Sequence, residues 1–304
     1  MPLWAVLALG AGTLQTARNA ISRSFAFQLS PALNTWARFA FNLPFSGSLF
    51  LVLYLWHGAP ALPATFFAGC LVTAIAQLLG NVTLVAAFRR GNFAQAIALH
   101  KLEVAFAALI GALLFAEHPT ASGWLGVAAC TAGVLAINLG RLRGPAGWRR
   151  AVHLDAGTVL AIASGLLWAS ASFALKETNT VFALANPRVG DGRFEAAANT
   201  LFHTTWIEVA LLTAWLRFAE PGALAAVAVH GRRMAALGAS AFGGSICWYW
   251  AYSLTLVAYV KAVGQFEAVV AVVLSLTVWH EREVLRQIPG VALILLGIGL
   301  VLLG

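Results

Sequence analysis

Long apolar runs, separated by short polar connections, occupy nearly the whole chain. A run of about 20 apolar residues is long enough to cross the hydrocarbon core as a helix. Strands are excluded because an open sheet edge would leave unpaired backbone groups in lipid. The pattern predicts an all-α membrane protein with ten transmembrane helices, at about 3–22, 33–56, 65–88, 93–115, 120–139, 156–175, 199–218, 234–253, 257–279 and 284–303.

Composition agrees with this pattern and excludes several classes of function. Hydrophobic residues make up 61% of the 304 residues, charged residues only 10%, and the mean hydropathy is +0.83. No room is left for a soluble domain, so any function must lie among the helices. The formal charge of +8 would suggest a nucleic-acid partner in a soluble protein, but here the arginines lie in short connections and we interpret them as topology signals. The three cysteines are far apart and lack metal-ligand spacing, so we expect no metal and no cofactor.

The chain resembles itself after a shift of 164 residues. That shift superposes Glu103 on Glu267, Glu117 on Glu281, Gly126 on Gly290 and Gly133 on Gly297. The repeat predicts two five-helix halves, at 1–140 and 156–304, joined by a linker at 141–155. An odd number of spans in each half gives the second half the opposite orientation, as in the inverted repeats of many secondary transporters.

Basic residues are distributed unevenly between the connections. The connections after even-numbered spans hold three, namely Lys176, Arg188 and Arg193. Those after odd-numbered spans hold eleven, namely Arg89, Arg90, Arg141, Arg143, Arg149, Arg150, Arg217, Arg232, Arg233, Arg282 and Arg286. The positive-inside rule therefore predicts cytoplasmic odd connections and both termini outside.

Two segments carry a resemblance to a known family. Residues 88–138 contain LEVAFAALIGALLFAEHPTASGWLGVAACTAGVLAIN, and residues 254–303 contain FEAVVAVVLSLTVWHEREVLRQIPGVALILLGIGLVLL. Each has a Glu entering an apolar helix, a Glu at its end, a short polar turn and a final helix with spaced glycines. Both segments resemble the EamA domain of the drug/metabolite transporter superfamily. The family commonly has Pro directly after the first Glu, where this chain has Val104 and Ala268.

The resemblance implies a ten-helix permease of the plasma (inner) membrane, with a central cavity between its halves. It implies a small-molecule substrate, such as an amino acid or a drug-like compound, and often export. Family members are usually drawn with both termini cytoplasmic, opposite to the charge rule. Alternating access around a site at the bilayer midplane is the leading hypothesis, with proton coupling as a further one. The alternatives are an intramembrane lipid-modifying enzyme and a membrane assembly subunit without transport activity.

Charged residues within the predicted spans are the main candidates for substrate or proton binding. Each would cost about 2.5–3.5 kcal/mol at a span centre on insertion scales, so they are expected to face a cavity or a partner. They are Lys101, Glu103, Glu208, Lys261 and Glu267. Glu103 and Glu267 either bind protons and substrate or pair to pin helices together. Lys101 has no charged counterpart, because the repeat places Gln265 there.

Neighbouring residues complete the candidate set. His100 precedes Glu103 by three positions, which predicts that it is the local partner of that carboxylate. Lys261 and Gln265 share a helix face, although Lys261 could instead extend to the interface. Glu208 has no counterpart in the matching span, where Arg38 and Asn42 are the nearest polar residues. It serves either a substrate-specific role or an interhelical hydrogen bond. Trp248 and Tyr252 could line a pocket or form an interfacial belt, and Arg18 is expected to face the bundle interior.

Overall fold

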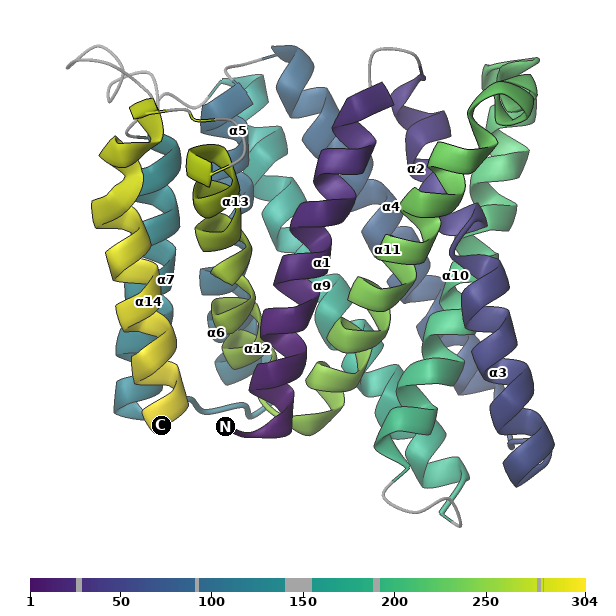
Figure 1. Cartoon of the computed structure of the whole chain (residues 1–304). Helices are drawn as coiled ribbons and strands as arrows, with labels where there is room; N and C mark the ends of the chain where they lie inside the picture. The colour runs from purple at the N-terminus through teal and green to yellow at the C-terminus, as the bar shows by residue number, and fades with distance from the viewer. Residues whose placement is uncertain (26–28, 91–92, 140–154, 188–191, 278–279, 281) are drawn as a thin grey trace. The chain divides into compact units, whose positions relative to one another are not determined.

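The described part of the chain forms helices joined by turns, with no strand among its residues (Figure 1). The computed structural model describes residues 1–25, 29–90, 93–139, 155–187, 192–277, 280 and 282–304. The predicted linker, apart from Asp155, and Glu281 lie outside these residues.

The helices follow the apolar runs of the sequence. They are α1 (Leu3–Phe25), α2 (Pro31–Ala40), α3 (Leu43–His57), α4 (Ala64–Arg90), α5 (Phe93–His100), α6 (Glu103–Leu114), α7 (Ala121–Leu139), α9 (Ala156–Ala185), α10 (Arg193–Ala219), α11 (Ala226–Leu254), α12 (Val257–Gly264), α13 (Phe266–Thr277) and α14 (Ile288–Leu303). Short 3-10 helices, Ala223–Ala225 and Arg282–Gln287, precede α11 and α14.

Several of these segments are long and apolar enough to cross a membrane. Six of those described meet that test, and α10 with α11, bent by 116°, make a seventh if counted as one span. Side chains such as Leu113, Leu184 and Phe218 are more than three-quarters exposed, as expected where lipid covers a helix. The chain is therefore an all-helical, multi-pass membrane protein, and ten spans remain a prediction.

Three spans that the sequence predicts as continuous helices are interrupted. The predicted span at 33–56 breaks between α2 and α3, at Phe41 and Asn42; that at 93–115 breaks at Lys101 and Leu102; and that at 257–279 breaks at Gln265. At the second and third breaks, a backbone N–H group bonds to the carbonyl three positions earlier and not four, which tightens the turn. These bonds are Leu102 N to Leu99 O at 3.2 Å and Gln265 N to Ala262 O at 3.1 Å. Apolar periodicity does not indicate these breaks, because it does not register a single tightened turn.

The chain divides into two compact units. The first unit comprises Met1–Leu9, Ala76–Phe173 and Thr255–Gly304, and the second unit comprises Gly10–Ile75 and Ala174–Leu254. Each unit draws segments from both predicted sequence halves, so the units and the halves are different divisions of the chain.

Close packing of glycines joins α7 to α14 in the first unit. A methyl group added at Gly126 would lie 2.7 Å from the Gly297 carbonyl oxygen, and one at Gly133 would lie 2.6 Å from that of Gly290. The two helices therefore run antiparallel with their backbones in contact. Such contact holds helices together in lipid, where the hydrophobic effect gives no drive for association.

In the second unit, α10 packs against both α2 and α11. A cluster of buried apolar side chains joins the three helices: Leu33, Ala37, Leu216, Met234 and Leu237. Trp36 on α2 also donates its indole N–H to the Thr213 hydroxyl on α10 at 2.7 Å. These contacts fix the register between α2 and α10.

The glycine contact predicts a difference between two residues of α14. Gly297→Ala would press a methyl group against Cys130 N and Gly126 O, both 2.7 Å away, whereas Gly299 has nothing within 4 Å of an added methyl group. We expect Gly297→Ala to lower stability by about 1–3 kcal/mol through overpacking, and Gly299→Ala to be neutral or slightly stabilising. Melting temperatures of the two purified variants in detergent measure the difference. Equal melting temperatures would contradict the contact.

Candidate functional site

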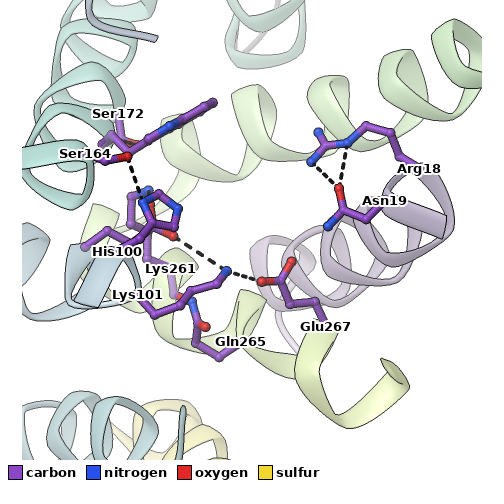
Figure 2. A network of polar contacts seen from close by, with 11 residues as sticks. Arg18, Asn19, His100, Lys101, Ser164, Ser172, Lys261, Gln265 and Glu267 are labelled. Carbon is purple, nitrogen blue, oxygen red and sulfur yellow. Dashed lines mark hydrogen bonds and ion pairs between the residues drawn. The ribbon is translucent and has the colours of Figure 1, made fainter. Parts of the chain in front are cut away.

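Four charged side chains form a chain of ion pairs at two helix breaks of the first unit. Lys101 lies in the α5–α6 break and Glu103 begins α6. Lys261 lies in the last turn of α12, and Glu267 lies in the first turn of α13. Lys101 Nζ donates to Glu267 Oε1, an ion pair that Figure 2 shows directly. Lys261 Nζ donates to Glu103 Oε2 at 3.0 Å. Lys101 Nζ also lies 4.0 Å from Glu103 Oε1, so the four charges alternate in sign along one string. We call these residues the four-charge cluster.

Burial makes this pairing a physical requirement. The four side chains are between 6% and 14% exposed. An ion in such surroundings loses most of its hydration, and only a close opposite charge with good hydrogen-bond geometry offsets that loss. Two lysines and two glutamates sum to zero, so the cluster is neutral as a whole. Breaking any single pair would leave an uncompensated charge.

His100 does not pair with Glu103, contrary to the expectation from their spacing. Its Nδ1 lies 3.1 Å from the Ser164 hydroxyl on α9, a contact visible in Figure 2. The single hydroxyl proton of Ser164 is donated to the Gly80 carbonyl at 2.7 Å. Ser164 must therefore accept from His100, which assigns the proton to Nδ1 of the imidazole. The prediction fails because the helix breaks directly before Glu103, which removes the i, i+3 geometry.

Lys261 is buried, so the interpretation in which it extends to the interface is wrong. Only 5% of the residue is exposed, and its ammonium group meets Glu103. Gln265 lies just after α12 and donates its Nε2 to the Lys261 carbonyl at 3.2 Å. This bond satisfies a carbonyl in the last turn of α12, beside the break.

Two small residues of α9 fit the α5–α6 break, and sequence reasoning missed both. An added methyl group at Gly165 would lie 2.6 Å from the His100 carbonyl oxygen, so the backbone of α9 touches the break. Its neighbour Ser164 is fully buried and holds His100. Adjacent small residues in an apolar helix are a weak signal for close helix contact.

Glu117 serves a structural role within the first unit. Its Oε2 accepts the backbone N–H of Val257, the first residue of α12, at 2.9 Å. Free N–H groups at a helix start favour a carboxylate partner. Glu117 thus caps a helix that begins 140 residues later in the sequence.

The remaining predicted site residues belong to the second unit. Glu208 lies on α10 and is 1% exposed. Trp248 and Tyr252 stack on each other on α11, with ring centroids 5.8 Å apart. Arg18 on α1 donates to the Asn19 side chain through two nitrogens, at 3.1 and 3.3 Å (Figure 2).

The four-charge cluster predicts strong coupling between Glu103 and Lys261. We expect Glu103→Gln or Lys261→Met alone to destabilise the protein by about 3–5 kcal/mol, because each leaves a buried charge unpaired. The double variant should recover most of that loss. A double-mutant cycle on melting or denaturant unfolding in detergent measures the coupling. Glu177→Gln, at an exposed position of α9, is the matched control and should change stability little. Additive losses in the double variant would contradict the pairing.

A comparison with solved structures finds a protein of similar fold. A solved structure described only as "Crystal structure of protein" matches 98% of this chain and 94% of its own, with a TM-score of 0.66 and 16% identity. At that identity the match shows the fold alone. No curated protein matches the chain.

A family model supplies the remaining finding. The model of the EamA-like transporter family, which belongs to the drug/metabolite transporter superfamily, matches residues 2–139. That segment carries the α5–α6 break with Lys101 and Glu103. Residues 2–139 of this chain are therefore similar to the EamA-like transporter family.

Proposed function

We propose that the chain is a secondary transporter of small metabolites, such as amino acids or drug-like compounds, in the plasma membrane. We further propose that it works by alternating access and that two inverted five-helix halves carry the motion. The observation that carries the proposal is the four-charge cluster at two matching helix breaks. Broken helices that bear charged groups inside a membrane mark transport pathways in many secondary transporters.

The repeat is supported by the way the breaks and contacts recur. Helices α5 and α12 each have eight residues and start 164 positions apart, and a break follows each of them. Cys130 lies against Ile294, the residue 164 positions later. The glycine contacts pair Gly126 with Gly297 and Gly133 with Gly290, so the shift exchanges one contact for the other. Two copies related by a two-fold axis would produce this pattern.

The four-charge cluster suggests how a conformational change could depend on a bound solute. Lys101 and Lys261 each cross from one repeat to a glutamate of the other. Separating the repeats at this point would expose unpaired charges, at a cost of several kcal/mol per ion. A solute charge or a proton that replaces the lost partner removes that cost. The cluster would thus permit movement only when its charges stay compensated.

Proton coupling follows as the finer hypothesis. A carboxylate that binds a proton becomes neutral and no longer needs its lysine. Glu103 and Glu267 occupy equivalent repeat positions, so each could accept a proton in one of the two access states. Glu103→Gln or Glu267→Gln would fix one carboxyl in a neutral form.

Transport by these variants tests the proposal. Cells that express the protein should tolerate toxic amino-acid or drug analogues better than cells without it. We expect Glu103→Gln and Glu267→Gln, at matched membrane levels, to lower export rates by about tenfold or more, equivalent to about 1.4 kcal/mol or more. Glu177→Gln should retain transport. A protein that changes neither tolerance nor efflux for any compound in such a panel would contradict the proposal.

Proton coupling has a separate test in membrane vesicles. Flux of the identified substrate should rise when a pH gradient is imposed, and it should fall when an ionophore collapses that gradient. The residual flux of Glu103→Gln and Glu267→Gln should respond less to the gradient than that of the wild type. Flux that ignores the gradient in the wild type would refute coupling and leave transport itself intact.

A further inference from the structure

A second group of buried polar side chains lies in the second unit, away from any residue of the four-charge cluster in the sequence. Glu208 and Asn42 are each 1% exposed, and Thr200 and Thr204 are fully buried. Thr200, Thr204 and Glu208 follow one another at intervals of four along α10, so they share one helix face. Asn42 lies in the break between α2 and α3.

The register between α10 and the α2–α3 segment brings Asn42 and Glu208 to the same level. Trp36 meets Thr213, and Phe50 stacks on Phe202 with ring centroids 4.6 Å apart. The two segments are therefore antiparallel. Asn42 lies six residues after Trp36, which is about two-fifths of the way from Trp36 to Phe50. Two-fifths of the way from Thr213 back to Phe202 is close to Glu208.

The break itself is closely packed. A methyl group added at Gly238 on α11 would lie 2.3 Å from the Phe41 carbonyl carbon, so α11 contacts the break with bare backbone. Beyond the break, Pro44 lies in the first turn of α3. The position of Asn42 is thus set by packing from α11 and by the start of a new helix.

Polar atoms gather here without protein partners. Among the described residues, Glu208 Oε1 and Asn42 Oδ1 are buried and accept no hydrogen bond. Arg38 Nε, one helical turn before Asn42, is also buried and unpaired within that part of the chain. Buried polar atoms in folded proteins are almost always bonded, so several orphans in one region indicate a site for another molecule.

The charges of this region indicate what kind of molecule fits. Arg38 is the charged group that acts electrostatically on Glu208, yet the two form no direct ion pair in the described structure. When both groups are ionised their charges cancel, and a ligand with a net charge would then leave the buried region unbalanced. A ligand that presents N–H donors to Glu208 and Asn42 and an acidic acceptor to Arg38 keeps the balance and satisfies the orphan atoms.

We propose that Arg38, Asn42 and Glu208 form a binding site for a small zwitterion that carries a free ammonium group and a carboxylate. The ammonium group donates to Glu208 Oε1 and Asn42 Oδ1, and the carboxylate accepts from Arg38. The claim that this zwitterion is the transported substrate rests on the proposed function. Binding by itself does not depend on transport.

Binding to the purified full-length protein in lipid nanodiscs tests the chemical class. The twenty standard α-amino acids serve as zwitterion probes in calorimetry and thermal-shift measurements. The tightest probe is then compared with its decarboxylated amine, its N-acetyl acid and its trimethylammonium analogue, which keeps the charges but has no N–H donor. We expect each analogue to bind about tenfold or more weakly. The proposal is overturned if no probe binds, or if any analogue binds as well as the parent.

Variants locate the site. Glu208→Gln should weaken binding of the tightest probe by about tenfold or more, and Glu177→Gln should leave it unchanged. Because Glu208→Gln alone strands Arg38, the double variant Arg38→Gln with Glu208→Gln restores charge balance and should melt close to the wild type. Wild-type binding by this folded double variant would overturn the site.

Flux measurements separate this inference from the proposed function. Binding of a zwitterion that is lost in the double variant, without flux into proteoliposomes, would uphold the site and refute transport of that zwitterion. Flux of another solute by a protein that binds no zwitterion would uphold transport and refute the site.

Discussion

The electrostatic cost of a buried charge in a bilayer governs the interior of this protein. A lysine or glutamate among apolar helices is tolerated only beside an opposite charge, because neither lipid nor protein replaces its lost hydration. In the first unit this constraint ties Lys101 to Glu267 and Lys261 to Glu103. The helix breaks are consistent with the same constraint. Each break places charged residues where the backbone is not helical, and the oppositely charged side chains of the two breaks meet there.

Neither of the paired breaks depends on proline. Val104 and Ala268 stand where related sequences commonly have Pro, yet the helices break directly before Glu103 and at Gln265. Other local interactions are present at these breaks. At each break a backbone N–H group bonds to the carbonyl three positions earlier and tightens the turn. At the second break, the Gln265 side chain also donates to the Lys261 carbonyl. At the first break, Gly165 lets α9 contact the backbone. Tertiary packing and side-chain hydrogen bonds thus accompany a deformation that a proline would otherwise favour.

Apolar periodicity located the apolar segments but not the breaks within three of them. The shift of 164 residues predicts that Glu103 and Glu267 are equivalent positions. The partners of these residues were not predictable, because they depend on the register between helices that are far apart in sequence. Spacing along one helix favoured His100 for Glu103, but a break removed that geometry and Lys261 took its place. The role of Ser164 was not predictable from the sequence, because a serine in an apolar helix usually bonds its own backbone. This serine bonds Gly80 and His100.

The two polar groups differ in how completely they are satisfied, and that difference separates their roles. In the four-charge cluster each charged group has a protein partner, so it can hold a conformation and release it when a charge is compensated. In the second unit, by contrast, Glu208 Oε1 and Arg38 Nε lack partners among the described residues. A structural ion pair would have closed that gap, because leaving buried polar atoms unbonded destabilises the fold. Retaining unbonded groups in a closely packed region is consistent with selection for a ligand that completes them.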